Sequence, residues 1–428
     1  MRSSLKILFT AAVLAPGVPS YSQPAASAPA ATEPAPVFEP VPTLNAAEIL
    51  QPAYFQGPNF SVRVPVPTFA GSNQYTIDTP FGIFQADGNA MLIRRIAEIN
   101  GIAALQEVSK SKEFGEAAAQ AATVPINVAR DLVTQPVETI SSVPRGLWNL
   151  VNNAGTAIKQ AATSGTASPD AVSNAVSSMT GFSKTKRDIA LRLGVDPYTD
   201  NQVFQTELSK VAWPVFLGKF TVGLGFSAIS GGVGTALSAA NVTNSLVESV
   251  REKSPADLRK MNLALLTNTM GVPAADASAF LDNPAISPTT QTILVATLGQ
   301  LGNIPGQTAF IRQAATSQSE HDALAYQQSV QIMAKLNTSS PITRITHVSG
   351  LPVCQTKDGT VVVPIQWDYV AWTPAAAAFI AALKAQSFTP PPAAYTVMIT
   401  GTMSPLTLQN LAALNVNAVQ LALPGPLR

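Results

Sequence analysis

This chain has almost no cysteine and few charged residues. Cys354 is the single cysteine among 428 residues, so no internal disulfide can form and the core must hold the protein together. Charged residues make up 12% of the chain, well below the usual quarter of soluble domains. Lysine and arginine (26) nearly balance aspartate and glutamate (25), which leaves no overall field to attract phosphate backbones. We therefore expect no nucleic-acid partner.

Histidine is also scarce, and the common metal-binding and nucleotide-binding motifs are missing. The two histidines are His321 and His347, and the sequence has no HExxH, CxxC or EF-hand spacing. Glu320, His321 and Asp322 are consecutive, so on a helix they point in different directions, which favours a solvated helix face over an ion site. GxSxG, GxGxxG and GxxxxGK[ST] motifs do not occur in a suitable context. The sequence predicts no metal and no cofactor.

The N-terminus has the layout of a bacterial secretory signal peptide. Two cations precede an apolar run at residues 7–18, which is too short to span a bilayer as a mature helix. Small side chains permit cleavage before Gln23, and a second possible cut follows Ala28. We expect residues 1–22 to be removed and the mature protein to be periplasmic or secreted, with membrane association left open.

The remaining chain divides by composition and pattern into four parts. Residues 23–44 are rich in Pro and Ala and lack apolar periodicity, which predicts a disordered tether. The expected fold class is α+β and predominantly α-helical: a helical body with an N-terminal β-hairpin and a small C-terminal α+β sheet unit. The expected boundaries are 45–180 for the β-hairpin with short helices, 181–340 for the helical core domain and 341–428 for the C-terminal unit.

Local patterns place the elements of the N-terminal half. Alternating residues predict strands at 61–65, 74–78 and 82–86, followed by an amphipathic helix from about Ala90. Prolines between residues 113 and 162 limit the length of helices there. Residues 163–178 are rich in Ser, Thr, Gly and Ala, which indicates a flexible boundary.

Capping signals and a change of period place the later elements. Thr199, Ser254 and Ser287 are expected helix starts, and residues 306–336 are expected to form one long helix. Strands at 343–349 and 359–364 are expected to flank a turn at Lys357-Asp-Gly359. Helices starting at Thr373 and Ser404 and strands at 395–400 and 418–423 complete the C-terminal unit.

One segment has no charge over 28 residues, from Phe220 to Val247, and it follows the aromatic residue Trp213. Its length would let it cross a bilayer, and its small residues would permit close helix packing there. Its many Ser, Thr, Gly and Asn residues favour a buried helical hairpin in the core instead. The residues that define this core or membrane segment are Trp213, Phe220, Gly223, Gly225, Phe226, Gly231 and Gly234.

Two groups of side chains are candidates for a functional site. Cys354 and His347, with Asp358 and Asp368 nearby in sequence, could form a thiol nucleophile with a base and an orienting carboxylate, although a lone cysteine is usually a buried apolar residue. Trp367, Tyr369 and Trp372 concentrate aromatic rings that could stack on a ligand or partner, or could anchor the sheet on the helices.

These patterns favour a non-catalytic, exported cell-envelope protein that acts as a binding or assembly module. Its expected partners are another envelope protein or a second copy of itself, and no specific small molecule is implied. Two alternatives remain: a membrane-inserting or membrane-associated protein that uses residues 213–247, and a hydrolase or thiol enzyme centred on Cys354 and His347.

Overall fold

A six-stranded, largely antiparallel sheet opens the fold. The computed structural model describes residues 37–122, 169–221 and 244–428, and every element below belongs to the unit Phe38–Arg428. The strand order is β1-β4-β5-β3-β2, and β6 pairs with the other edge of β5. The strands are β1 (Thr43–Asn45), β2 (Gln56–Gly57), β3 (Phe60–Val62), β4 (Pro65–Phe69), β5 (Ser72–Thr79) and β6 (Gly82–Asp87), with two short helices, α1 (Ala46–Ile49) and α2 (Pro52–Phe55), between β1 and β2.

The predicted hairpin forms the centre of this sheet. Strands β5 and β6 pair from Gln74↔Asp87 to Thr79↔Gly82, as the alternating pattern predicts. The sequence analysis missed β4, because its residues Pro65 and Pro67 argue against a strand. Both prolines are exposed while Val66 and Thr68 point inward, so β4 tolerates them on its outer face.

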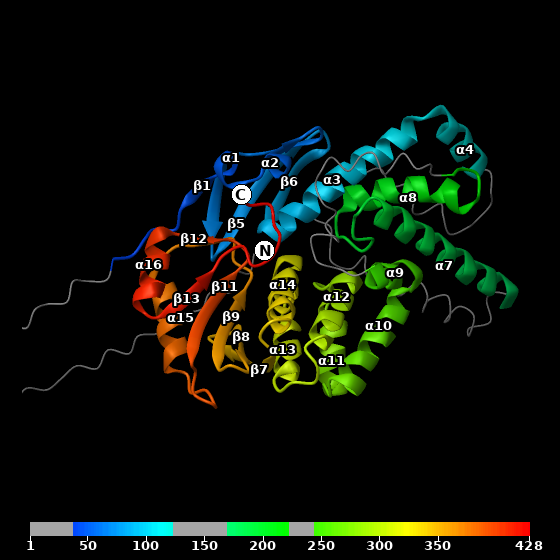
Figure 1. Cartoon of the computed structure of the whole chain (residues 1–428). Coiled ribbons are helices and arrows are strands. Elements are labelled where there is room, and N and C mark those ends of the chain that lie inside the picture. Colours follow the sequence, from blue (N-terminus) through cyan, green and yellow to red (C-terminus); the bar gives the residue numbers. More distant parts are fainter. Residues whose placement is uncertain (1–36, 123–168, 222–243) are drawn as a thin grey trace, which may run out of the picture. The chain divides into compact units, whose positions relative to one another are not determined.

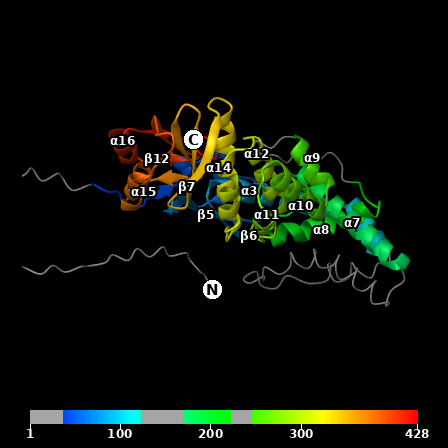
Figure 2. The same ribbon diagram turned by 90° about the horizontal axis from the view of Figure 1, so that it is seen from below.

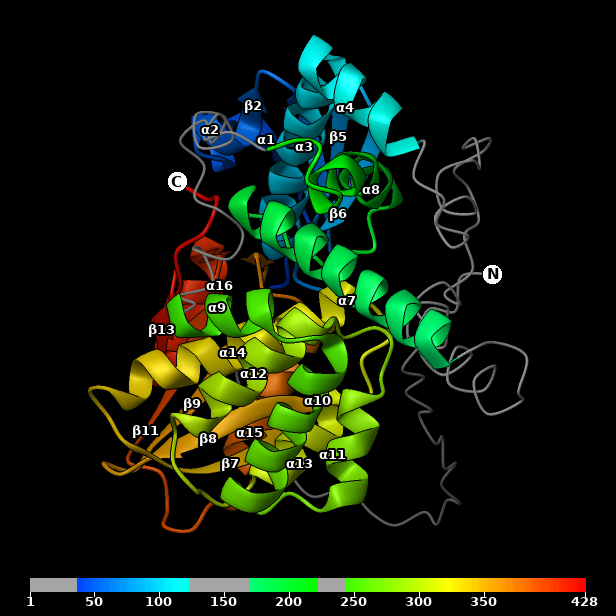
Figure 3. The ribbon, with the colours of Figure 1, turned by 90° about the vertical axis from the view of Figure 1, so that its right-hand side faces the viewer.

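Helix α3 (Asn89–Lys110) follows β6 directly and begins where the sequence predicts it. It packs against the sheet with Leu92, Ile96 and Ile99, and farther along it joins α4 (Lys112–Ala122) and α8 (Gln202–Phe216) in a second apolar cluster. Figure 3 shows α3, α4 and α8 side by side, with α7 (Pro169–Arg192) crossing below them.

Two boundaries in this region differ from the sequence-based expectation. Helix α7 begins at Pro169, inside the stretch that was expected to be a flexible boundary. Helix α8 is capped by Asn201, whose side chain accepts a hydrogen bond from the Phe204 amide, and not by Thr199. The Thr199 hydroxyl is bonded to Glu98 of α3, so a tertiary contact uses the group that could have capped the helix. Part of the expected run of short helices, residues 123–162, lies outside the described residues.

The helical core domain continues with short, well-capped helices. Ser254 and Ser287 cap α10 and α12 as predicted, each by accepting a backbone hydrogen bond three residues on. The helices are α9 (Asn244–Glu252), α10 (Pro255–Ala264), a π-helical turn (Leu265–Thr269), α11 (Ala274–Leu281) and α12 (Pro288–Gly299).

The expected single helix over 306–336 is in fact two helices. Helix α13 (Gln307–Ala314) ends before Ser317, and α14 (Glu320–Asn337) starts with a capping box between Ser319 and Asp322. The apolar pattern alone did not reveal this break, because both helices bury residues in the same cluster. Figures 1 and 2 show α14 between the C-terminal sheet, beside β7, and helix α12.

The C-terminal unit is a five-stranded mixed sheet of order β13-β11-β9-β8-β7. Its helices start at Thr373 and Ser404 as predicted. The elements are β7 (Ile342–Val348), β8 (Leu351–Thr356), β9 (Thr360–Ile365), α15 (Pro374–Ala385), β11 (Ala394–Ile399), α16 (Pro405–Ala413) and β13 (Val416–Val419), with a small parallel pair, β10 (Tyr369–Val370) and β12 (Thr402–Met403).

The predicted hairpin in this unit was wrong by one strand. The turn at 357–359 joins β8 to β9, and β7 reaches β8 through a separate turn at Ser349-Gly350. Strand β8 is buried at nearly every position, so it shows no alternation, and it contains Pro352. These features hid it from a reading based on period.

The two ends of the described chain fasten the N-terminal sheet to the C-terminal unit (Figure 1). Glu39, which lies in the predicted tether, accepts hydrogen bonds from the Trp372 amide (2.7 Å) and the Ser404 hydroxyl (2.5 Å). At the other end, Arg428 Nε donates to the Leu50 carbonyl at 2.7 Å. We expect these contacts to oppose separation of the two sheets.

Gly306 allows the loop before α13 to cover the edge of β7. A Cβ at this position would lie 1.8 Å from the Ile345 carbonyl oxygen, and its φ is +99°. We therefore expect Gly306→Ala to lower the free energy of unfolding by roughly 3 kcal/mol or more, because a backbone clash adds to an unfavourable φ. The matched control is Gly302→Ala, where φ is +76° and a Cβ meets nothing, with an expected cost of about 1 kcal/mol. Urea denaturation measures both, and equal losses would contradict the steric reason.

Candidate functional site

The buried carboxylate of Asp368 is the centre of the densest group of reactive side chains in the described residues. Its Oδ2 accepts hydrogen bonds from the backbone amides of Asn73 (2.9 Å) on β5 and Asn89 (3.1 Å) at the start of α3. Its Oδ1 accepts one from Gln366 Nε2 (3.2 Å). Asp368 has no exposed surface, and burial raises its pKa to about 6 although these hydrogen bonds act in the opposite direction. One carboxylate thus joins three elements that are far apart in sequence.

A chain of buried polar groups continues from Asp368 into the N-terminal sheet. Tyr75 donates its hydroxyl to Asn89 Oδ1 at 2.6 Å and accepts from Asn73 Nδ2 at 2.9 Å. Asn89 Nδ2 and Gln366 Oε1 are buried and have no hydrogen-bond partner among the described residues. Buried polar atoms of this kind normally bind an ordered water molecule. The centre is therefore polar, closely packed and nearly saturated with internal hydrogen bonds.

Ser72 and His321 lie beside this centre and contact each other. The distance from Ser72 Oγ to His321 Nε2 is 3.1 Å, and it joins the β4–β5 turn to the first turn of α14. Gly88 permits the approach, because a Cβ there would lie 3.0 Å from His321 Cε1. Gly71 plays the same part on the other side, where a Cβ would lie 2.5 Å from the Trp367 ring. Both glycines have a positive φ, which suits the tight turns that they occupy.

A serine, a histidine and an aspartate in one neighbourhood invite comparison with a hydrolytic triad. In a triad the carboxylate orients the histidine, and the serine is open to substrate. Here the hydrogen bonds recorded for Asp368 come from Asn73, Asn89 and Gln366, and Ser72 is only 6% exposed. This arrangement suits a structural junction better than nucleophilic attack.

A buried ion-pair cluster adjoins the junction at the start of α14. Arg94 of α3 lies 2.5 Å from Glu320 and 3.5 Å from Asp196, and it donates to the Thr290 hydroxyl at 3.0 Å. Burial raises the pKa of Glu320, while Arg94 and Arg95 act against that shift. Glu320 is thus largely buried and paired, so the expected solvated helix face is wrong at this residue. Tertiary packing decided this, because the paired arginines lie more than 200 residues away.

The same cluster extends along α3 to Glu98. Arg95 lies 2.7 Å from Glu98 and 3.0 Å from Asp200. Glu98 also accepts hydrogen bonds from the Thr199 hydroxyl (2.5 Å) and Asn201 Nδ2 (2.8 Å). These contacts fix the loop before α8 on α3. They supply charge compensation inside the fold and leave no open charged cleft among these residues.

The predicted thiol centre is placed in the core. Cys354 on β8 is fully buried, and burial raises the pKa of its thiol to about 12. His347 is a diagonal cross-strand neighbour of Cys354, since Ile345 pairs with Cys354 and His347 with Pro352. Burial lowers the pKa of His347, and its Nε2 is without a hydrogen-bond partner among the described residues. The two residues share a sheet face, but that face packs against helices.

The two carboxylates proposed for that centre lie elsewhere. Asp358 is exposed in the β8–β9 turn, where bonds from the Thr356 hydroxyl and the Thr360 amide lower its pKa. Asp368 belongs to the junction with Asn73 and Asn89. The structure therefore brings His347 near Cys354 and does not bring Asp358 or Asp368 to them.

The three candidate aromatic residues mostly serve the core. Trp372 is buried, and Trp367 packs against Phe379 at a ring distance of 6.5 Å. Tyr369 is half-buried on β10. These rings anchor α15 to the sheet, and they do not form an open stacking surface.

The uncharged segment lies mostly outside the described residues, including Gly223, Gly225, Phe226, Gly231 and Gly234. Of its described members, Trp213 packs against Phe182 at 5.7 Å, and Phe220 packs against Phe114 at 5.4 Å. Within the described ranges, no helix has the length and apolar character needed to span a membrane.

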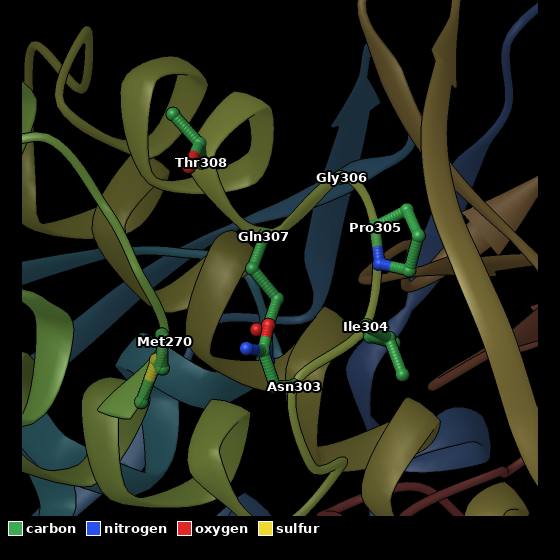
Figure 4. A pocket seen from close by; sticks show the side chains of 7 residues that line it. All are labelled: Met270, Asn303, Ile304, Pro305, Gly306, Gln307 and Thr308. Atoms are coloured by element: carbon green, nitrogen blue, oxygen red, sulfur yellow. The ribbon is translucent and has the colours of Figure 1, made fainter. Parts of the chain in front are cut away.

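A surface pocket of about 340 Å³ lies at the start of α13 (Figure 4). Met270 and the loop from Asn303 to Thr308 line it. Gln307 is buried there and donates Nε2 to the carbonyls of Leu298 (3.1 Å) and Gly302 (2.8 Å). Its Oε1 has no partner among the described residues. The amide therefore joins α12 to α13, and the pocket offers little chemistry beyond this one acceptor.

Sequence reasoning found Asp368 but assigned it to the wrong partners. It missed Ser72, Asn73 and Asn89, for which the only local signal was a pair of turn glycines, Gly71 and Gly88. No group of three His, Cys, Asp or Glu side chains that could hold a metal ion occurs in the parts of the chain that the structure describes. The chain matches no protein-family model, no curated protein and no solved structure.

Proposed function

We propose that this protein is an exported, non-catalytic module of the bacterial cell envelope, and that it binds a partner through an exposed apolar surface on its N-terminal sheet. Its reactive groups are engaged in internal contacts, as the bonds to Asp368 and Glu320 illustrate. The signal-peptide pattern and the Pro/Ala-rich segment 23–44 support export and tethering.

The observation that carries this proposal is a line of exposed apolar residues where the tether joins the sheet. Phe69 is 74% exposed and Val41 is 54% exposed. Continuing the β1–β4 register from Thr43↔Pro67 places Val41 opposite Phe69, with exposed Pro67 beside them. We call Val41, Pro67 and Phe69 the arm surface. Large apolar side chains grouped on a surface are typical of contact sites, whereas isolated ones are not.

Site-specific photo-crosslinking in cells that export the full chain tests this proposal. A photoreactive residue in place of Phe69 is expected to give a defined adduct with an envelope protein. The control is the same residue in place of Lys112, whose side chain is 86% exposed on α4 and far from the arm surface in sequence. The same adducts from both positions, or none from Phe69, would refute binding through the arm surface.

The two alternatives rest on other observations. Membrane insertion depends on residues 213–247, most of which lie outside the described residues. A hydrolase would have to use the Ser72–His321 contact or the Cys354–His347 pair, and low exposure of both nucleophiles weighs against it. The binding module is the proposal that the exposed surface supports best.

A further inference from the structure

A long part of the C-terminal unit carries no charge at all. From residue 385 to residue 427 the chain contains no Asp, Glu, Lys, Arg or His. This stretch includes β11, α16 and β13. Charged residues normally cover protein surfaces, and their depletion marks the centres of interfaces. The absence of charge is therefore informative wherever this stretch is exposed.

Strand β13 is the exposed element of that stretch. It is an edge strand whose recorded partner is β11, paired from Tyr395↔Val416 to Met398↔Val419. Val419 is 37% exposed, and Leu421, just after the strand, is 42% exposed. Leu414, between α16 and β13, is 37% exposed. These three side chains and the edge of Val416–Val419 are called the β13 edge below.

The opposite edge of the same sheet is protected. The Ile345 amide of β7 donates to the Pro305 carbonyl at 2.9 Å, and Gly306 lets this loop approach. Strand β7 also carries Arg344 and His347. Proteins usually protect edge strands by cover, charge or proline, because open edges pair with other strands. Strand β13 has none of these devices along Val416–Val419.

We infer that the β13 edge pairs with the β13 edge of a second copy of this chain, in antiparallel register about a two-fold axis. An uncharged edge fits an uncharged partner, because a charged side chain placed opposite it would lose water without gaining an ion pair. A two-fold axis near Asn417 or Ala418 presents each copy with the same strand, as closed dimers require. The pairing continues the five-stranded sheet across both copies.

The dimer should be weak, because the strand has only four residues. Two short strands bury little surface, and small interfaces of this kind belong to transient complexes. Contacts of Leu414, Val419 and Leu421 across the axis supply the apolar part of the interface. This inference does not depend on the arm surface, which uses β1 and β4, so either can fail without the other.

Sedimentation velocity of the full mature chain over a range of concentrations tests the inference. The unaltered protein is expected to shift from monomer toward dimer as concentration rises. Val419→Lys and Asn417→Lys each place a charge on the edge and should keep the protein monomeric at concentrations where the unaltered chain is a dimer. Two variants are used so that misfolding of one, detected by circular dichroism, leaves the other as the test.

The matched control is Ile83→Lys, which alters an exposed aliphatic residue on β6, an edge strand of the other sheet. It should dimerise like the unaltered chain. A protein that stays monomeric at every concentration would overturn the inference. So would a dimer that survives both β13 variants, or one that Ile83→Lys also abolishes.

Discussion

Replacing Asp368 with Asn is expected to remove a pH dependence of stability that the unaltered protein shows between about pH 4 and pH 6. Burial raises the pKa of Asp368 from 3.8 to about 6. A carboxyl whose pKa is higher in the folded state stabilises the fold fully below pH 3.8, and this contribution is lost as the pH rises through about 6. A shift of this size corresponds to about 3 kcal/mol.

The measurement is urea denaturation of both proteins at several pH values from 4 to 7.5. The unfolding free energy of Asp368→Asn minus that of the unaltered chain should increase with pH by about 3 kcal/mol and then level off. Contributions from other titrating groups, including Glu320, largely cancel in this difference. The Asn side chain is tolerated because the Gln366 amide can turn and offer its unpartnered Oε1 to the new NH₂ group.

Asp358→Asn is the control for this pH series. Asp358 is exposed, and bonds from Thr356 and Thr360 lower its pKa. Its contribution is therefore present at neutral pH and is lost only as the pH falls below the ordinary carboxyl range. A difference between Asp368→Asn and the unaltered chain that does not change with pH would show that Asp368 is not the buried carboxylate described here.

Replacing Arg94 with Met is expected to lower the free energy of unfolding by about 3–5 kcal/mol at neutral pH. Arg94 is the counter-charge of Glu320 at 2.5 Å and of Asp196 at 3.5 Å, and all three side chains are nearly buried. Met keeps much of the length and the apolar stem, so the loss reports mainly the two carboxylates left without their partner. Urea denaturation followed by tryptophan fluorescence measures it.

Arg63→Met is the matched control. Arg63 makes an ion pair with Asp78 at 2.8 Å, but both side chains are about half exposed (48% and 49%). The expected loss is at most about 1 kcal/mol, because water already solvates both charges. A second change, Glu320→Gln in the Arg94→Met background, should recover part of the stability. Similar losses for Arg94→Met and Arg63→Met would mean that burial does not strengthen the dependence on Arg94.

Sequence patterns predicted those features that depend on a few neighbouring residues. The hairpin of β5 and β6, the start of α3 and the caps at Ser254 and Ser287 all follow from residues close together in the chain. Patterns failed where a neighbour distant in sequence changed the outcome. Thr199 caps no helix because it bonds to Glu98, and β8 shows no alternation because both of its faces are covered.

The composition alone determined that this protein is an α+β chain without disulfides, held by apolar packing, with no charge excess to attract nucleic acid. Only the tertiary structure decided which polar groups meet. Asp368 joins Asn73 and Asn89, and Glu320 joins Arg94, across separations of more than 200 residues. Hydrogen bonds and ion pairs act over a few ångströms, so they depend on how the chain packs, and no local pattern in the sequence records them.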